Sequence, residues 1–334
     1  MVEPAKYYEN SGPGKIRCLL CPHFCTIKKD DYGKCRVRKN EKDVLVTDVY
    51  GQAKGLSFDP IEKKPLYHFF PGTQILSLGT PGCNMQCFFC QNWNMSQSGI
   101  DKSGNKQVLP AEILTISKSE PKNLGIAFTY SEPTIFYEYM YDTAILFKEN
   151  GLKTCMISNG FINEKPLLDL IPLIDAFNID LKAFTNSFYK KYTKSSLKPV
   201  LNSLEIIRTK KRHLELSFLV IPGLNDNMDS FKEMLCWISD KSGKETVLHI
   251  SRYFPKYKSN IPATSNQKLE ELFDIAKEKL DYVYIGNYSG EKGQNTICSN
   301  CNSIQISRNY YNTMVYLSVD GKCSKCGYKI MNMM

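Results

Sequence analysis

The segment Gly79-Thr80-Pro81-Gly82-Cys83-Asn84-Met85-Gln86-Cys87-Phe88-Phe89-Cys90-Gln91-Asn92-Trp93 decides the fold of this chain. Its three cysteines follow the spacing C-x-x-x-C-x-x-C, which would arise by chance in only about 2% of chains of this composition. Three thiolates can bind three irons of a [4Fe–4S] cubane and leave the fourth iron open to a ligand or substrate. A structural metal site normally closes its coordination, so the missing fourth cysteine favours a catalytic site. The alternative is a zinc site that a distant histidine completes.

Short apolar segments alternate with amphipathic ones from residue 75 onward. The segments expected as strands are 75–78, 124–129, 154–158, 176–180, 215–220, 247–251 and 282–285. One expected helix begins after Pro133 and ends near Gly151, and another carries Leu269, Leu272, Phe273, Ala276 and Leu280 on one face. This α/β alternation predicts a parallel sheet, open or closed into a barrel, with chemistry at the carboxyl ends of its strands.

Three regions are expected along the chain. Residues 1–72 are irregular and rich in turns, and we interpret them as a small cysteine-rich metal module. Residues 73–290 form the barrel. Residues 291–334 return to short strands bounded by cysteine pairs, which is typical of a zinc ribbon.

Thirteen cysteines occur in a chain without a recognisable export signal, so short spacings indicate metal ligands rather than disulfides. Eleven fall into three groups. Cys155 and Cys236 stand apart in apolar stretches, and we expect both to be buried, inert thiols. The C-terminal group has two C-x-x-C pairs that predict one Zn²⁺ site, formed by Cys298, Cys301, Cys323 and Cys326.

The N-terminal group, Cys18, Cys21, Cys25 and Cys35, leaves two metals open. Its spacing is not the paired pattern of a zinc knuckle, so a second [4Fe–4S] cluster is one expectation. Zinc is slightly favoured, because a module this small needs a staple and structural zinc supplies folding free energy directly. Either metal would be fully ligated.

Composition excludes several classes of protein. With 42% hydrophobic and 23% charged residues, the 334-residue chain is globular rather than disordered. No apolar run approaches the ~18 residues of a membrane span, and the first residues lack a signal-peptide pattern, so we expect a cytoplasmic protein without a membrane partner. The formal charge of +9 falls to roughly +4 once two zinc tetrathiolates and one three-thiolate cubane are counted. A nucleic-acid partner is therefore not favoured.

The cysteine loop resembles the signature of the radical S-adenosylmethionine (SAM) superfamily, in which an aromatic residue precedes the last cysteine. Phe89 occupies that position. The resemblance implies a partial (β/α)6 barrel with small cysteine-rich metal modules at both ends. It further implies that Cys83, Cys87 and Cys90 are catalytic and bind a [4Fe–4S] cluster whose open iron chelates SAM. Reductive cleavage of SAM would give a 5′-deoxyadenosyl radical that abstracts hydrogen from a substrate.

The resemblance also assigns cofactor-binding residues at later strand ends. Phe89 lies in the cluster loop, and Glu132 would accept hydrogen bonds from the amino group of SAM. Ser158 and Asn159 would approach its carboxylate or ribose, while Asp180 and Lys182 resemble a segment that approaches SAM in glycyl-radical activating enzymes. The alternatives are a helix-dipole acid for Glu132, a plain turn at Ser158 and Asn159, and a solvated ion pair for Asp180 and Lys182.

A narrower resemblance is to the AmmeMemoRadiSam-system radical SAM enzymes, relatives of pyruvate formate-lyase activating enzyme. It rests on segments 18–25, 59–66, 90–93, 130–134 and 285–287. His249 lies earlier than the histidine of the activating enzymes, so a structural imidazole is at least as well supported as a SAM contact. The resemblance implies a flavodoxin- or ferredoxin-type electron donor and AMMECR-like and Memo-like protein partners.

The resemblance thus predicts a radical SAM enzyme acting on an unidentified small molecule or protein, and a glycyl-radical-activating type of enzyme is one form that it allows. One alternative is a radical SAM enzyme that modifies RNA or a cofactor. The non-enzyme alternative is a zinc-dependent binding or scaffold protein in which all eleven grouped cysteines are structural.

Overall fold

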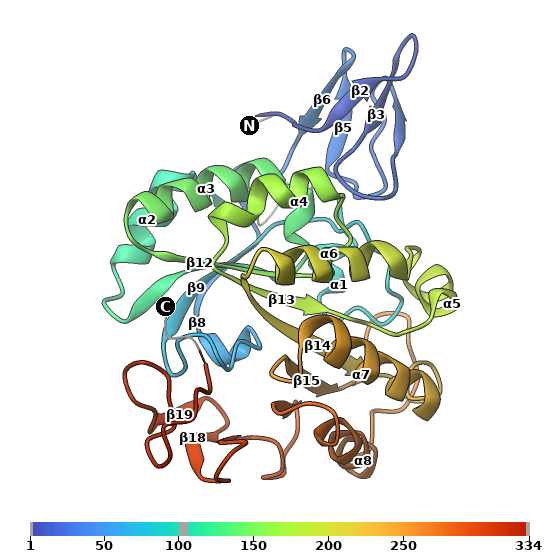
Figure 1. Cartoon of the computed structure of the whole chain (residues 1–334). Coiled ribbons are helices and arrows are strands. Elements are labelled where there is room, and N and C mark those ends of the chain that lie inside the picture. Colours follow the sequence, from blue (N-terminus) through green and yellow to red (C-terminus); the bar gives the residue numbers. More distant parts are fainter. Residues whose placement is uncertain (1–2, 100–105, 332–334) are drawn as a thin grey trace.

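An eight-stranded sheet forms the centre of the computed structural model, which describes residues 3–99 and 106–331 (Figure 1). The strand order is β16-β15-β14-β13-β12-β11-β9-β8, in which β8 pairs antiparallel with β9 and all other neighbours are parallel. The strands span Gly55–Pro60 (β8), Gln74–Gly79 (β9), Asn123–Phe128 (β11), Lys153–Ser158 (β12), Ala176–Asp180 (β13), His213–Val220 (β14), Val247–Arg252 (β15) and Val283–Gly286 (β16).

The helices are arranged beside the sheet in their chain order (Figure 1). Contacts between helices join α2 to α3, α4 to α6, α6 to α7 and α7 to α8. Such a single layer of helices is typical of a sheet that curves into a partial barrel. Their bounds are Trp93–Ser96 (α1), Pro110–Lys118 (α2), Tyr137–Glu149 (α3), Glu164–Leu170 (α4), Asn186–Phe188 (α5), Leu197–Thr209 (α6), Met228–Ser242 (α7) and Asn266–Lys277 (α8). The described residues also form short helical turns at Ile61–Lys63, Pro133–Phe136, Ile171–Leu173 and Tyr189–Thr193.

All seven strands predicted from the apolar pattern are confirmed within one or two residues, as are the helices after Pro133 and through Leu269. Most strand residues are buried because they line the core of the barrel, and every residue of β13 except Asp180 is buried. Gly125 lies where the β9–β11 register shifts, and a Cβ there would overlap the backbone carbonyl of Lys153. Only glycine fits this irregular point of the sheet.

Two expectations about the N-terminal region need correction. Residues 55–60 were placed in the N-terminal module, but they form β8, the antiparallel edge strand of the barrel sheet. The first 50 residues are also not irregular, since they form two small antiparallel sheets. These are β1-β6-β5 (Glu3–Pro4, Val44–Thr47, Arg38–Glu41) and β2-β3-β4 (Tyr8–Asn10, Lys15–Cys18, Thr26–Lys28). Strands this short carry too few residues for their alternation to stand out among turn signals.

A buried ion pair joins the N-terminal sheets to the barrel. The Arg38 guanidinium lies 2.8 Å from the Glu138 carboxylate on α3 and donates a second hydrogen bond to the backbone oxygen of Lys6. Glu138 also accepts a hydrogen bond from the backbone N–H of Lys6. Because both charges are buried and hydrogen-bonded, removing one partner alone would leave an uncompensated charge in the interface.

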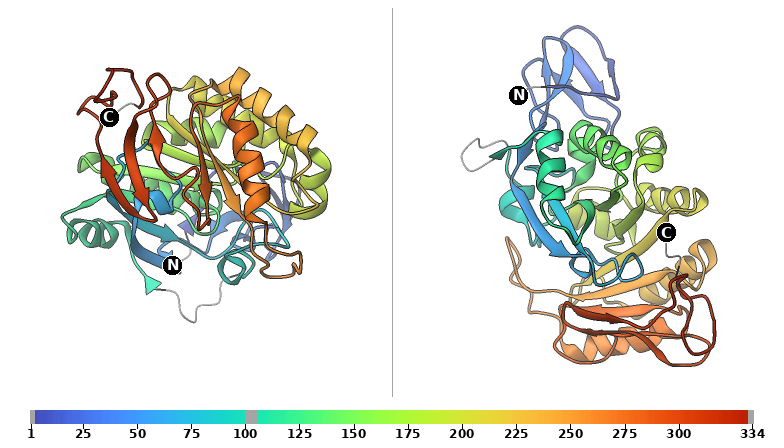
Figure 2. Two further views of the ribbon diagram at one scale, coloured as in Figure 1. Left: turned by 90° about the horizontal axis from the view of Figure 1, so that it is seen from below. Right: turned by 90° about the vertical axis from the view of Figure 1, so that its left-hand side faces the viewer.

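The C-terminal strands β17 (Thr296–Ile297), β18 (Ile304–Asn309) and β19 (Asn312–Val315) form a third small sheet at the opposite end of the molecule from the N-terminal strands (Figure 2). A buried apolar cluster that includes Tyr67, Tyr284 and Ile306 joins it to the barrel. The remaining two-stranded pairing is between β7 (Gln52–Ala53) and β10 (Lys106–Gln107).

The two isolated cysteines differ from each other. Cys155 on β12 is buried as expected, but Cys236 on α7 is exposed, so the expectation of a second buried thiol was wrong. Its neighbours Met234, Leu235 and Ile238 are buried, and a residue next to them along a helix can point away because successive residues are turned by about 100°. No helix of the described residues is both long and apolar enough to cross a membrane.

Candidate active site

A cavity of about 430 Å³ lies where the parallel strands of the barrel end. It collects side chains from segments that follow β9, β11, β12, β13 and β16, as expected for the carboxyl edge of such a sheet. Every residue that the sequence assigned to catalysis or cofactor binding lines it: Cys83, Cys87, Phe89, Cys90, Glu132, Ser158, Asn159, Asp180 and Lys182. The structure therefore brings these residues together, and their individual roles stay predictions.

The loop between β9 and α1 supplies three free thiols to this cavity. Cys83 and Cys87 are buried, and burial raises the pKa of Cys87 to about 12. Polar groups of the chain already face the sulfurs: the backbone N–H of Met85 donates to Cys83 at 3.3 Å, and the Ser96 hydroxyl lies 3.0 Å from the Cys90 sulfur. A buried thiol loses its proton readily only where a bound cation, such as a metal ion, stabilises the thiolate that remains.

This donor set fits a [4Fe–4S] cluster. The three thiols converge on one cavity without any disulfide, and no other cysteine of the described residues lines it. Three thiolates would leave one iron open toward the polar wall formed by the later strand ends. When bound, such a cluster supplies the electron that cleaves SAM.

Glu132 is a buried part of the polar wall and accepts four hydrogen bonds from the chain. Its carboxylate accepts hydrogen bonds from the backbone N–H and hydroxyl of Thr134, at 3.0 and 2.7 Å, and from the hydroxyl of Ser158 at 2.7 Å. The backbone N–H of Asn159 donates to its second oxygen at 2.8 Å. Burial nevertheless raises the pKa of Glu132. Three of these donors share Oε1, whereas Oε2 accepts only one hydrogen bond, so one acceptor position on Oε2 stays open to a further donor such as an ammonium group.

The structure thus gives Glu132 a clear local task, which is to hold the ends of β11 and β12 together. Asn159 continues the network, because its side-chain amide donates to Asn84 at 2.9 Å and faces the Cys83 sulfur at 3.8 Å. Glu132 also begins the helical turn Pro133–Phe136 as its N-cap residue. The expected SAM contact of Glu132 is untested, and its hydrogen bonds support a positioning role.

An ion pair faces the cluster loop from the end of β13. The Lys182 ammonium lies 2.8 Å from the Asp180 carboxylate, and both side chains line the cavity. Burial opposes the charge of Lys182, but Asp180 and the nearby Cys87 outweigh it and raise the lysine pKa. A cation kept beside Cys87 would offset negative charge on ligated thiolates.

The sequence interpretation missed a polar cluster on the β8 side of the cavity. Asp59 on β8 accepts hydrogen bonds from Lys63 and Lys64, at 2.6 and 2.7 Å, and from the Tyr130 hydroxyl at 2.6 Å. Burial alone would raise the pKa of Asp59, but these three donors lower it. Lys63, Lys64 and Tyr130 all line the cavity. The adjacent lysines are visible in the sequence, but only the fold brings segments 59–64 and Tyr130 together.

His249 does not line this cavity. Its ring nitrogen lies 2.7 Å from the buried carboxylate of Glu215, which also faces His213 at 2.8 Å. Glu215 further accepts hydrogen bonds from the backbone N–H groups of Tyr67 and His68. These contacts support the structural interpretation of His249.

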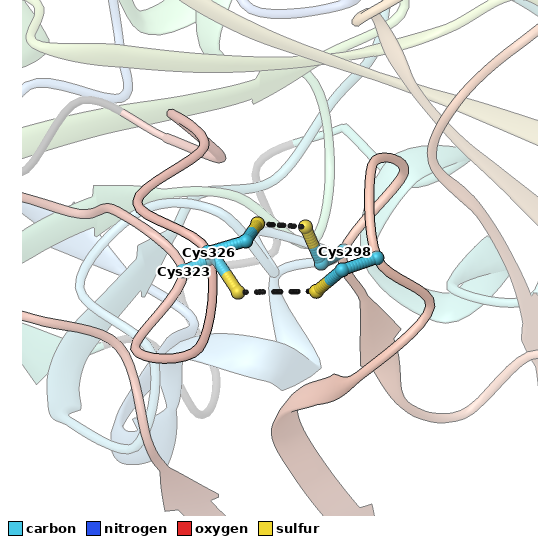
Figure 3. Close-up of side chains that lie close together, drawn as sticks. Cys298, Cys323 and Cys326 are labelled. Atoms are coloured by element: carbon cyan, nitrogen blue, oxygen red, sulfur yellow. Dashed lines mark hydrogen bonds between the residues drawn. The ribbon is translucent and has the colours of Figure 1, made fainter.

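The C-terminal cysteines form a compact group (Figure 3). The sulfurs of Cys298, Cys301, Cys323 and Cys326 all lie within 4.8 Å of one another, with two pairs at 3.6 Å. Against the effect of burial, the Ser303 hydroxyl and nearby backbone N–H groups lower the pKa of Cys323 to about 6, which favours the thiolate form that binds metals. The group could therefore bind a metal ion.

Comparisons with known proteins agree with this fold and indicate the family. The radical SAM superfamily profile matches residues 77–238, which include the cluster loop. An uncharacterized protein of Methanocaldococcus jannaschii is 42% identical over 330 residues, 98% of each chain. Pyruvate formate-lyase 1-activating enzyme of Escherichia coli is 25% identical over 184 residues, covering 53% of this chain and 73% of the relative.

A solved structure supports the same fold. A radical SAM methyltransferase from Sphaerobacter thermophilus superposes with a TM-score of 0.51 at 10% identity, covering 91% of this chain and 81% of that one. The chain belongs to the radical SAM superfamily and is an enzyme of the radical SAM type. The family uses SAM and a [4Fe–4S] cluster.

Proposed function

We propose that this enzyme cleaves SAM reductively at a cluster bound by Cys83, Cys87 and Cys90 and directs the resulting 5′-deoxyadenosyl radical to a hydrogen atom of a protein or small-molecule substrate. The observation that carries this proposal is the convergence of the three thiols and the polar strand-end residues on one cavity. The similarity to pyruvate formate-lyase 1-activating enzyme favours an activating type of enzyme. Placement within the AmmeMemoRadiSam group is part of the same proposal and rests on the sequence segments 18–25, 59–66, 90–93, 130–134 and 285–287.

The chain's own residues would orient SAM and protect the reaction. Ser158 and Asn159 are held by the Glu132 carboxylate, so polar groups at the end of β12 are fixed before SAM binds. Lys182 balances negative charge beside Cys87, and Phe89 gives the cavity a buried apolar surface. Part of the catalytic arrangement is therefore rigid in advance, which lowers the cost of binding SAM in a reactive geometry.

The C-terminal cysteines are proposed to bind one Zn²⁺ that stabilises the ribbon rather than taking part in catalysis. The two pairs of sulfurs at 3.6 Å support this proposal, because zinc–sulfur bonds of about 2.3 Å in a tetrahedron place ligand sulfurs about 3.8 Å apart.

The experiment that tests the substrate class measures 5′-deoxyadenosine formation by reconstituted protein with SAM and a one-electron reductant. Candidate partner proteins and total RNA are added separately. Stimulation by a protein that acquires a radical or a new modification supports an activating-type enzyme. Stimulation by RNA alone, with modified nucleosides in the product, would contradict it.

A further inference from the structure

The N-terminal sheets contain a second group of thiols that the proposed SAM chemistry does not use. Cys18 ends β3, Cys21 and Cys25 lie in the loop before β4, and Cys35 follows β4. All four line one small cavity as free thiols. Cys18 and Cys35 are buried and the other two are half-buried, so the group is mostly withdrawn from solvent.

The spacing of these sulfurs distinguishes them from the C-terminal group. Four sulfurs around one Zn²⁺ stand about 3.8 Å apart, given zinc–sulfur bonds of about 2.3 Å. Among residues 3–99 and 106–331, only the C-terminal group has ligand atoms that all lie within 4.8 Å of one another. A cubane carries each thiolate on a different iron, which separates the sulfurs further. The N-terminal thiols therefore share the wider arrangement of Cys83, Cys87 and Cys90.

The surroundings of this cavity suit an anionic group. Cys18 and Cys35 are buried and the other two are half-buried, so four thiolates in this cavity would require compensating positive charge. The Arg38 guanidinium lines the cavity and is almost fully buried. Its Nε–H has no hydrogen-bond partner, although the other guanidinium nitrogens are bonded to Glu138 and Lys6. A buried donor without a partner is costly, and sulfur acceptors in the cavity would satisfy it.

The chain segment that carries these thiols also contacts the catalytic loop. A Cβ on Gly82, the residue before Cys83, would lie 2.8 Å from the carbonyl oxygen of Cys35. Gly82 has a φ of +96°, so glycine is required there both by conformation and by the close approach. Two residues beyond Cys21, the His23 ring nitrogen lies 2.7 Å from the backbone oxygen of Asn84. The two cysteine loops thus pack against each other at two points.

We propose that Cys18, Cys21, Cys25 and Cys35 bind a second, fully thiolate-ligated [4Fe–4S] cluster that lies against the catalytic loop. The wide spacing of the sulfurs and the unpartnered Arg38 Nε–H favour this cluster over zinc. Because four thiolates occupy all four irons, this cluster leaves no iron for SAM. The metal content of the N-terminal thiols does not depend on the proposed function. Only the contrast between this closed cluster and a catalytic cluster with one open iron rests on the proposed function.

The deciding experiment uses the full-length Cys83→Ala/Cys87→Ala/Cys90→Ala variant, reconstituted anaerobically. The expected content is about four irons and about four sulfides, half of about eight each in the wild type, with one zinc in both. The electron paramagnetic resonance spectrum of the reduced variant should not change when SAM is added. The proposal would be overturned if the variant held extra zinc without iron or sulfide, or if its N-terminal thiols held no metal. It would also be overturned if adding SAM shifted the spectrum of the reduced variant.

A complementary variant, Cys18→Ala/Cys35→Ala, should lose about four irons and keep a spectrum that responds to SAM. Cys236→Ala is the matched control, because this exposed cysteine lies outside all three groups and its loss should leave the iron content unchanged. If the complementary variant fails to fold, the triple variant still decides the question. A wild-type protein with about eight irons that does not cleave SAM would refute the proposed function and leave the second cluster intact.

Discussion

Replacing Glu132 with Gln tests the polar wall of the active site. The carboxylate accepts two backbone N–H bonds, one from Thr134 and one from Asn159, on different oxygens. A glutamine must turn its amide NH₂ toward one of them, so either orientation sets a buried donor against a buried donor. Leaving one such group unsatisfied costs about 1–3 kcal/mol, and the remaining bonds weaken because the acceptor is no longer charged. We expect Glu132→Gln to lower the free energy of unfolding by about 2–3 kcal/mol.

The same substitution should weaken SAM binding, since Ser158 and Asn159 lose the group that holds them. A loss of about 1.5–3 kcal/mol corresponds to a roughly ten- to hundredfold higher dissociation constant. Denaturation curves and calorimetric titration of SAM into reconstituted protein measure the two effects. Glu164→Gln is the control, because this exposed acid in the first turn of α4 should contribute less than about 1 kcal/mol. A Glu132→Gln protein with wild-type stability and affinity would refute the reasoning.

The remaining predictions concern the modules around the active site. Replacing Cys298 and Cys301 by Ala should remove one zinc and lower the melting temperature while iron content and SAM cleavage persist; loss of cleavage in a folded barrel would contradict a structural role. Gly82→Ala should destabilise the protein by about 1–3 kcal/mol, from its positive φ and the contact with Cys35, whereas Gly14→Ala, with positive φ but open space, should cost less in the same melting assay. Burial lowers the pKa of His68 to about 3, so the unfolded chain binds a proton near pH 6.5 that the folded protein does not. Wild-type stability should therefore fall by about 2 kcal/mol from pH 7 to pH 5 through this group, and His68→Gln should lose that part of the slope; an unchanged slope in denaturation curves would show that His68 does not stay neutral.

The barrel strands were predictable because each is a short apolar segment between turn residues, and the cluster loop because its three cysteines are neighbours in sequence. Edge strand β8 was not, because its sequence Gly55–Pro60 mixes apolar and polar residues and ends in Pro60, which is a turn signal. The cluster of Asp59, Lys64 and Tyr130 was missed for a related reason. It joins residues about 70 positions apart, and local spacing carries no information about such contacts.

The sequence also did not allow us to predict which face of a helix is buried or which residues share hydrogen bonds. Cys236 sits among apolar residues along the chain, but its own direction depends on the phase of α7 against the barrel. Glu132 was correctly expected in the site, yet the number of donors that surround it follows only from the meeting of β11 and β12. Residue types and spacing thus indicated which side chains enter the cavity, while their hydrogen bonds required the fold.

The most direct test of the central claim is the yield of 5′-deoxyadenosine and methionine when reconstituted protein is mixed anaerobically with SAM and dithionite. The thiols of Cys83, Cys87 and Cys90 line the cavity, so the wild-type protein should form both products in equal amounts. The Cys83→Ala/Cys87→Ala/Cys90→Ala variant should form neither while its barrel stays folded. Equal cleavage by the wild type and this variant, or none by a wild-type protein with its full iron and sulfide content, would contradict the account.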